Sequence, residues 1–517
     1  MRWAILGLAA GVLATAGALY LYQDQRLPAA PGFHERDCWF STRNIGAARC
    51  GYMVVPENRQ RAESRTIRLP VVILKAAQGD VRREPILYLD GGPGGRAYLD
   101  DQVEIDSWIE MRKVFPPGHD LILLGQRGTG RSAADFDCPE LKTAALSLGA
   151  HAPTAEPPDV RALSIRAAAA CSRRLLAEGV DLTAYNSRES AADIAELRQA
   201  LGIESWTLYG ISYGTRIALS VLRYRPEGVR AVILDSVVAP QSAEGLKVAD
   251  FYRDALNWVL KDCPPDTDCA GSYRDQRNLY NQARAQMAER PLIFELADFL
   301  DAEELAAYDG DETDGHVVTL DHRFFDLLLL DAVMDPEAAL LVPALLHDIT
   351  TRRYVILKAR LRETLRLSTD YDSSISWAVY LSHVCHDEAP FQSPEAIAEA
   401  AGEAGDLGYM IEDHWPNYLC SHWPAGAADA VENTPVVSAV PALLLAGRFD
   451  PLTPPVLAQQ AAETLANGHV FTFAELGHGV LVQSPCAWRL TAQFLEHLKR
   501  PSAGRCSRGV LVNPGSP

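Results

Sequence analysis

A serine flanked by two glycines lies between an apolar run and a helix-like run, in residues 206–215 of the 517-residue chain. The stretch reads W-T-L-Y-G-I-S-Y-G-T, so Gly210, Ser212 and Gly214 form a Gly-x-Ser-x-Gly pattern. A sharp strand-to-helix turn lifts a serine hydroxyl above a sheet and aims the next backbone N–H at a reacting carbonyl. The stretch therefore predicts a nucleophilic serine, provided that a base and an orienting acid lie elsewhere in the chain.

Strand-like and helix-like segments alternate on both sides of this turn. Alternation of this kind predicts an α/β fold, with a mostly parallel, doubly wound sheet covered by helices on both faces. The predicted strands are residues 50–56, 66–74, 85–89, 120–124, 206–209, 229–234, 441–446 and 470–473. The predicted helices between them are residues 160–178, 189–201, 216–224, 454–465 and 487–498.

The alternation stops in residues 241–433, where the pattern is mostly helical. We interpret this region as an inserted helical cap domain. The core then consists of a first part, residues 27–240, and a second part, residues 434–517. The predicted cap helices are residues 246–261, 273–290, 302–308, 323–334, 337–360, 375–384 and 394–404.

The N-terminus predicts export. Residues 3–22 contain no charged side chain and are long enough to span a bilayer. Ala14-Thr15-Ala16 is also compatible with signal-peptidase cleavage. Residues 1–26 are therefore either a signal peptide or an uncleaved membrane anchor, and both place the rest of the chain in the periplasm, on the cell surface or outside the cell. A buried N-terminal helix is disfavoured because the run is apolar on every face.

The ten cysteines agree with export, because an even count in an exported chain favours disulfides. No Cys-x-x-Cys occurs, which gives no support to zinc ribbons or thioredoxin-like chemistry. Our hypothesis is sequential pairing, since each bond then closes a local loop: Cys38–Cys50, Cys138–Cys171, Cys263–Cys269, Cys385–Cys420 and Cys486–Cys506.

The formal net charge of −19 argues against nucleic acid and anionic membrane surfaces as partners. It mildly favours cationic or amine-bearing partners, although a contribution to solubility alone explains it as well.

Two candidate partners for Ser212 follow predicted strands near the C-terminus. Asp450 lies in the loop after residues 441–446, and His478 lies in a Gly-His-Gly loop after residues 470–473. Serine hydrolases of the doubly wound type carry nucleophile, acid and histidine in this chain order at the carboxyl edge of the sheet. We therefore predict Ser212, Asp450 and His478 as the catalytic residues. Asp235 is the rival acid, because it follows the predicted strand 229–234 at the same edge.

The sequence Gly-Gly-Pro-Gly-Gly at residues 91–95 follows another predicted strand. Glycines let backbone N–H groups approach a substrate oxygen without an intervening Cβ. We predict the N–H groups of Gly92 and Tyr213 as the oxyanion donors, with Gly91 as the alternative to Gly92. A phosphate-binding loop is disfavoured because the Gly-Lys-Ser/Thr ending of that motif is missing.

Five motifs follow predicted strands or span the strand-to-helix turn: residues 91–95, residues 126–132 (Gln-Arg-Gly-Thr-Gly-Arg-Ser), residues 210–215, residues 447–454 (Gly-Arg-Phe-Asp-Pro-Leu-Thr-Pro) and residues 477–479. Together they resemble the α/β-hydrolase aminopeptidases, namely the prolyl aminopeptidases and, more closely, the secreted tripeptidyl aminopeptidase-like group with a TAP-like C-terminal region. Two positions depart from the family pattern. Gly125 stands where the family usually has Asp, and Asp90 stands where prolyl aminopeptidases often have His, which weakens the transfer of proline specificity.

The resemblance implies an α/β-hydrolase fold and an exopeptidase that needs no cofactor or metal. It also implies acidic cap residues that recognise the free α-amine of a peptide substrate, for which Asp387 and Glu388 are the candidates. Their segment, residues 382–388, is also consistent with a solvated turn. Its two histidines, cysteine and two acids leave a metal site as a further alternative.

These observations predict an exported serine hydrolase, an aminopeptidase of tripeptidyl or prolyl type that acts on peptides with a free N-terminus. An esterase or lactonase would use the same catalytic residues. A non-catalytic binding protein would not need all three of them, and a membrane-tethered structural protein would explain only the apolar N-terminus.

Overall fold

The computed structural model of the chain describes residues 30–43, 46–77, 82–132, 136–141, 159–261, 275–301, 305, 317–506 and 510–511. Within these ranges the largest sheet has ten strands, in the order β1-β2-β3-β5-β4-β6-β7-β10-β11-β12. The strands are β1 (Gly32–Arg36), β2 (Ala48–Pro56), β3 (Thr66–Leu74), β4 (Ile86–Leu89), β5 (Leu121–Leu124), β6 (Trp206–Ile211), β7 (Val229–Asp235), β10 (Ala442–Gly447), β11 (Gly468–Phe473) and β12 (Val510–Leu511).

The middle of this sheet is parallel. Strands β5, β4, β6, β7, β10 and β11 pair in parallel, and the antiparallel strands β1, β2, β3 and β12 lie at the two sides. This arrangement confirms the predicted fold class. Because parallel strands end at the same edge, the loops after β4, β6, β7, β10 and β11 all emerge together, which is where sites form in such sheets.

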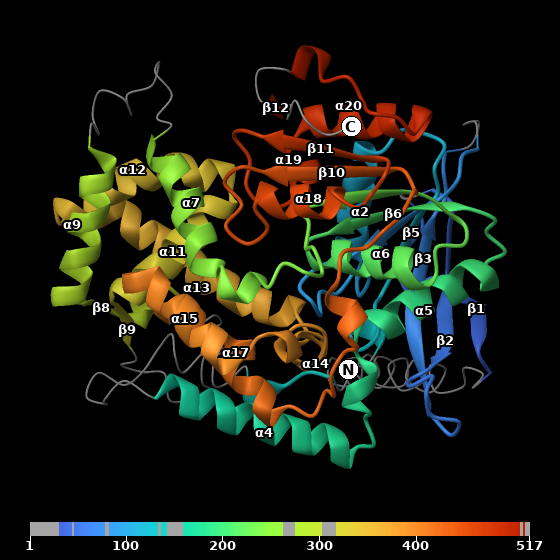
Figure 1. Cartoon of the computed structure of the whole chain (residues 1–517), viewed down its shortest axis with the longest axis horizontal. Helices are drawn as coiled ribbons and strands as arrows, with labels where there is room; N and C mark the ends of the chain where they lie inside the picture. The colour runs from blue at the N-terminus through green and yellow to red at the C-terminus, as the bar shows by residue number, and fades with distance from the viewer. Residues whose placement is uncertain are drawn as a thin grey trace, which may run out of the picture.

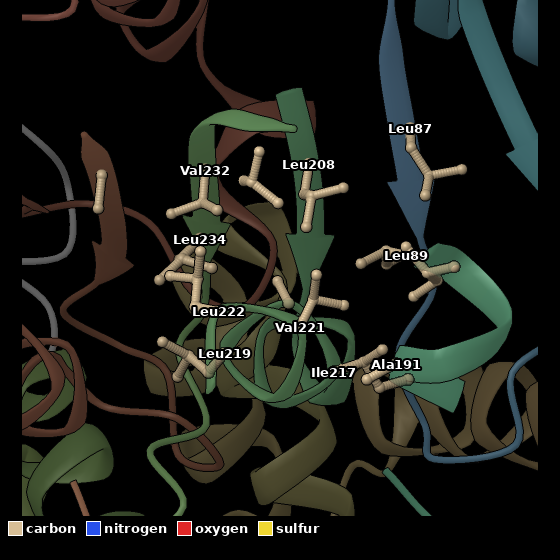
Figure 2. Close-up of a cluster of buried hydrophobic side chains, with 14 of the residues drawn as sticks. Leu87, Leu89, Ala191, Leu208, Ile217, Leu219, Val221, Leu222, Val232 and Leu234 are labelled. Carbon is tan, nitrogen blue, oxygen red and sulfur yellow. The ribbon is translucent and has the colours of Figure 1, made fainter. Parts of the chain in front are cut away.

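Helices cover both faces of the sheet, as the buried apolar residues on each face require. Helices α5 (Ser187–Ala200), α6 (Tyr213–Tyr224) and α18 (Pro455–Ala462) pack on one face, and α2 (Gln102–Met111), α19 (Val480–Gln483) and α20 (Pro485–His497) on the other. Figure 2 shows Ile217 and Val221 of α6 close to leucines and valines of β4, β6 and β7. The helix that begins beside Ser212 is thus held against the centre of the sheet.

A helical region lies between β7 and β10. Helices α7 (Val248–Lys261), α9 (Gln276–Glu289), α11 (His322–Met334), α12 (Pro336–Thr350), α13 (Val355–Ser374), α15 (Pro394–Ala404) and α16 (Tyr409–Glu412) share one apolar core. In Figure 1 most of these helices lie to one side of the sheet. The hairpin of β8 (Leu292–Glu295) and β9 (Val317–Leu320), which the sequence analysis did not predict, also belongs to this region.

The single helix predicted over residues 337–360 is wrong, because the structure has two helices there. The chain breaks between α12 and α13, where Arg352 and Tyr354 both have a φ of 57°. A right-handed helix cannot continue through such residues. Asp348 accepts hydrogen bonds from the N–H groups of Ile356 and Leu357 and so stabilises the start of α13. Hydrophobic periodicity persists across the break, which explains the error.

A second apolar cluster joins the helical region to the core. It contains residues of α4 (Val160–Ala177), α14 (Trp377–Asp387) and α17 (Trp415–Leu419). Helix α4 precedes β6 in the chain, yet it packs against helices of the inserted region and runs along its lower side in Figure 1. Part of the chain that we assigned to the core from sequence therefore supports the insertion.

The structure contains the disulfides Cys38–Cys50, Cys138–Cys171, Cys385–Cys420 and Cys486–Cys506. The fifth pair, Cys263–Cys269, lies outside the described residues and stays a prediction, as does the apolar N-terminal segment. Most of the predicted helix 302–308 also lies outside them. None of the helices in the described ranges is both long and apolar enough to cross a membrane.

Candidate active site

Ser212 occupies a sharp turn between β6 and α6. Its backbone has φ 54° and ψ −128°, a conformation that costs free energy for any residue with a side chain. A Cβ on Gly214 would lie 2.1 Å from the carbonyl oxygen of Leu89, and a Cβ on Gly210 would lie 2.4 Å from that of Gly214. Gly214 is therefore required by the close packing of the turn against β4, and Gly210 by the close approach of the first residues of α6.

Asp450 and His478 meet at the ends of β10 and β11. The Nδ1 atom of His478 lies 2.9 Å from Oδ2 of Asp450, whose side chain is fully buried. Thr453 donates hydrogen bonds to both carboxylate oxygens, from its hydroxyl at 2.6 Å and its N–H at 2.8 Å. Burial by itself raises the pKa of Asp450, but the His478 ring and these hydrogen bonds outweigh it and hold the pKa below its usual value. An ionised Asp450 can therefore orient the His478 ring.

The rival acid Asp235 has different contacts. Its carboxylate accepts hydrogen bonds from the N–H groups of Val480 and Leu481, at 2.9 and 2.8 Å, in the first turn of α19. The neighbouring Ser236 hydroxyl accepts one from Gly479 at 2.8 Å. Burial raises the pKa of Asp235 to about 6. Asp235 thus anchors the segment after His478, and the geometry favours Asp450 as the acid that contacts the imidazole.

The electrostatic surroundings of His478 favour its protonated form. Burial lowers the pKa of His478, but the Asp450 carboxylate outweighs burial and Asp235 adds to the effect, so that the pKa lies above its ordinary value. The backbone N–H of His478 donates to the carbonyl of Met334, the last residue of α11, at 3.1 Å. The helical region therefore contacts the histidine loop directly.

The raised pKa of His478 predicts how activity depends on pH. A general base must be neutral, so kcat/KM should fall as the pH decreases through the pKa of His478, with a midpoint above the ordinary histidine value of about 6.5. Replacing Asp450 by Asn should move this midpoint to lower pH, because the carboxylate that raises the pKa is gone. A pH–rate profile of both proteins measures the shift, and an unchanged midpoint would contradict the assignment.

The glycine loop lies against Ser212. A Cβ on Gly91 would be 2.8 Å from Cβ and 3.3 Å from Oγ of Ser212. The N–H of Gly91 donates to the Asp90 carboxylate at 2.9 Å, so it is already used. Within the described part of the chain, the N–H groups of Gly92 and Tyr213 make no hydrogen bond. This arrangement supports Gly92, rather than Gly91, as the partner of Tyr213 in an oxyanion hole.

The helical region also covers the glycine loop. The N–H of Ser376 donates to the carbonyl of Gly94 at 2.9 Å, and Ile375 forms an isolated antiparallel bridge with Gly95. A Cβ on Gly94 would lie 2.5 Å from the Ser376 carbonyl oxygen. The residues at the start of α14 therefore pack directly against the glycine loop beside Ser212.

The structure does not support Asp387 as a ligand for a substrate amine. Its side chain is fully buried, and Oδ2 accepts hydrogen bonds from the Ser187 N–H (3.0 Å), the Ser187 hydroxyl (2.6 Å) and the Tyr213 hydroxyl (2.8 Å). Oδ1 lies 2.7 Å from Nδ1 of His386. His386, Asp387 and Glu432 offer ligand atoms within 4.8 Å of one another, but a cation would have to compete with the donors that already use Asp387. Residue spacing could not show that this acid points into the core.

Glu388 lies in a different environment, together with Glu244, a residue that the sequence analysis missed. Both glutamates line a small pocket with Arg216, and Oε1 of Glu388 lies 3.8 Å from the Arg216 guanidinium. Among the described residues, Oε1 of Glu388 and Oε2 of Glu244 are buried and have no hydrogen-bond partner. Burial and the charge of Glu388 raise the pKa of Glu244 to about 8, and Asp450 contributes to this rise. No local pattern marks Glu244, because only tertiary packing brings it to Glu388.

Comparison with known proteins gives two family matches. Residues 84–262 match the model of the alpha/beta hydrolase fold, and residues 409–507 match that of TAP-like proteins. The first match contains Ser212 and the glycine loop, and the second contains Asp450 and His478.

Curated relatives have names consistent with these matches. Serine protease Hip1 of Mycobacterium tuberculosis (strain ATCC 25618 / H37Rv) is 25% identical over 337 residues, which cover 61% of this chain and 60% of the protease. Tripeptidyl aminopeptidase of Streptomyces coelicolor is 28% identical over 284 residues, which cover 51% of this chain and 50% of that enzyme. The chain thus matches between half and two thirds of the length of these relatives.

Solved structures similar to this chain include MGS-M2, an alpha/beta hydrolase enzyme from a deep-sea metagenome library. Its sequence identity is 14% and the TM-score is 0.38, over 83% of this chain and 95% of that one.

The two family models match the segments that carry the serine turn, the glycine loop, the acid and the histidine. On this evidence the chain belongs to the α/β-hydrolase fold family and carries a TAP-like C-terminal region.

Proposed function

We propose that this protein is an exported serine hydrolase, an aminopeptidase that releases N-terminal residues or short peptides from substrates with a free N-terminus. The contact between Asp450 and His478, at the same sheet edge as the Ser212 turn, is the observation that carries the proposal. The relatives named as a serine protease and a tripeptidyl aminopeptidase support the peptidase class.

In the proposed mechanism, Asp450 holds the His478 ring while the other ring nitrogen takes the proton of Ser212. The Ser212 oxygen attacks the carbonyl carbon of the scissile bond, and the N–H groups of Tyr213 and Gly92 stabilise the negative charge on the carbonyl oxygen. Protonated His478 then gives its proton to the leaving amine. Water attacks the acyl-enzyme with His478 again as the base, which releases the acid product and restores Ser212.

Glu244 and Glu388 are the groups that we propose for binding the substrate ammonium. The raised pKa of Glu244 favours its protonated form near neutral pH, and the positive charge of a bound ammonium would favour its ionisation, so that two carboxylates would then balance one guanidinium and one ammonium. A buried ammonium needs such partners, because an unpaired charge is costly to remove from water. Arg216 belongs to the first turns of α6, which begins beside Ser212, so this pocket is close to the proposed nucleophile.

The location outside the cytoplasm is also part of the proposal. The four disulfides support it, because such bonds persist in oxidising compartments. Membrane attachment through residues 1–26 stays a prediction and would be tested by fractionating cells that express the full chain.

A substrate panel tests the peptidase class. Wild-type protein should hydrolyse aminoacyl or tripeptidyl nitroanilides with a free amine much faster than their N-acetylated forms. A preference for short-chain p-nitrophenyl esters would indicate an esterase instead. Turnover of neither class by correctly folded protein would indicate a binding function.

Replacing Glu244 or Glu388 by Gln should raise KM for free-amine nitroanilides by about 10- to 100-fold, the scale of one charge-assisted contact of 1.5–3 kcal/mol. The rate for p-nitrophenyl acetate should change less than threefold, because an ester has no ammonium to bind. Glu432→Gln is the matched control, since Glu432 is also buried but lies outside this pocket. Equal losses for nitroanilides and esters would count against the assignment of these two glutamates.

A further inference from the structure

The side chain of Tyr213 is held as firmly as its backbone. The ring is buried, and its hydroxyl lies 2.8 Å from Oδ2 of Asp387, 3.1 Å from the Ser187 hydroxyl and 3.3 Å from Nδ1 of His383. The His383 ring also packs edge-on against the Tyr213 ring, with centroids 5.4 Å apart. The residue whose N–H is the proposed oxyanion donor therefore has its side chain fixed at the far end.

Asp387 is the centre of these contacts. It is the last residue of α14 in the helical region, Ser187 is the first residue of α5, and Tyr213 is the first residue of α6. One carboxylate therefore connects the inserted region with the beginnings of two core helices. Arg216 extends the connection, because its guanidinium donates to the backbone carbonyl of Asp387 at 2.8 Å.

The carboxylate is suited to this role because it is ionised and saturated with donors. Burial alone raises the pKa of Asp387, but hydrogen bonds from His383 and His386 hold it well below its usual range. Hydrogen bonds to a charged acceptor are about twice as strong as neutral ones. The hydrogen bond from the Tyr213 hydroxyl to the buried Asp387 carboxylate therefore restricts the movement of the first turn of α6.

We propose that Asp387 is a positioning residue that acts through the Tyr213 side chain to hold the Tyr213 N–H in place for the developing oxyanion. This inference rests on the proposed function. Oxyanion donors stabilise a transition state only when they are held at hydrogen-bond distance from the charged oxygen, and removing one costs about 10²- to 10³-fold in kcat. If the Tyr213 N–H is displaced rather than removed, kcat should fall by less than this loss of about 10²- to 10³-fold. Ground-state binding of the substrate does not depend on it, so KM should change little.

Asp387→Asn and Tyr213→Phe test this role, and both variants keep the backbone N–H of residue 213. Each should lower kcat by about 10- to 100-fold with KM within about twofold of wild type, and each should slow fluorophosphonate labelling of Ser212 in proportion. In the double variant the loss should be close to that of one single variant, because both changes break the same connection.

Ser382→Ala is the matched control. Ser382 is a fully buried residue of α14 that accepts a hydrogen bond from the Trp423 indole at 2.9 Å. The variant therefore loses a buried hydrogen bond in the same helix without changing the contacts of Tyr213, and its kcat should stay within about threefold of wild type. Thermal unfolding of all variants shows which losses reflect a smaller folded fraction.

Three results would overturn the inference: a wild-type kcat in Tyr213→Phe, losses that multiply in the double variant, or an equal loss in Ser382→Ala. They differ from a failure of the proposed function itself. If the aminopeptidase proposal fails but the protein is an esterase, the same variants can be measured with p-nitrophenyl esters. If the wild-type protein neither turns over substrate nor reacts with the fluorophosphonate, both proposals are wrong.

Discussion

Replacing Ser212 by alanine is expected to abolish labelling by a fluorophosphonate and to lower turnover by about 10⁴- to 10⁶-fold, the range for loss of a catalytic nucleophile. The reason is the geometry of the turn between β6 and α6. Ser212 adopts a strained backbone conformation that the tight packing of Gly210 and Gly214 enforces, and the glycine loop lies directly beside its hydroxyl. In-gel labelling and nitroanilide hydrolysis measure the two losses separately.

Ser220→Ala is the appropriate control for this experiment. Ser220 is a buried serine of the same helix, two turns further along, so its loss perturbs α6 without removing the proposed nucleophile. This variant should label and turn over like the wild-type protein. Hydrolysis that persists in Ser212→Ala at the wild-type rate would end the proposal of a serine mechanism.

The second large effect is expected from Asp450→Asn, which should lower kcat by about 10⁴-fold, the loss seen when the acid that orients a catalytic histidine becomes an amide. Asp450 is fully buried and contacts Nδ1 of His478 at 2.9 Å. An amide at this position no longer stabilises the protonated ring. Stopped-flow or steady-state kinetics give kcat without interference from the shifted His478 pKa when they are measured at a pH well above the acidic midpoint of the pH–rate profile.

Asp235→Asn serves as the comparison, because Asp235 is an equally buried acid at the same edge of the sheet. It contacts the N–H groups at the start of α19, so the variant should lower the midpoint of thermal unfolding. Its kcat should fall much less than that of Asp450→Asn. Loss of turnover in the Asp235 variant together with normal turnover in the Asp450 variant would reverse the assignment of the acid.

The core of the fold was predictable because its signals are local. The apolar runs that form β4, β6 and β10 are nearly continuous, as central strands buried on both faces must be. Strand β12 was missed, because two residues of a C-terminal tail carry no strand pattern and pair only because β11 offers an open edge. Helix α4 was predicted as a helix, but its own sequence does not reveal that it packs against the inserted region.

The inserted region was predictable in composition but not in its contacts with the site. Nothing near Met334 or Ser376 indicates that the two residues contact the histidine loop and the glycine loop. Both contacts go through backbone groups, which every residue type has. The sequence therefore predicts that a helical insertion exists, but it does not predict which surface of the core the insertion covers.

The sequence by itself determined the α/β fold and the candidates Ser212, Asp450 and His478, because each of the three belongs to a short motif at the end of a strand. The environments of Asp387 and Glu388 were decided only by the tertiary structure. These two carboxylic acids are adjacent in the sequence, yet their surroundings differ. Asp387 accepts hydrogen bonds from residues of α5 and α6, whereas Glu388 lies beside Glu244 and has a buried oxygen without a hydrogen-bond partner. Helix α14 ends between them, so the two side chains meet different parts of the core.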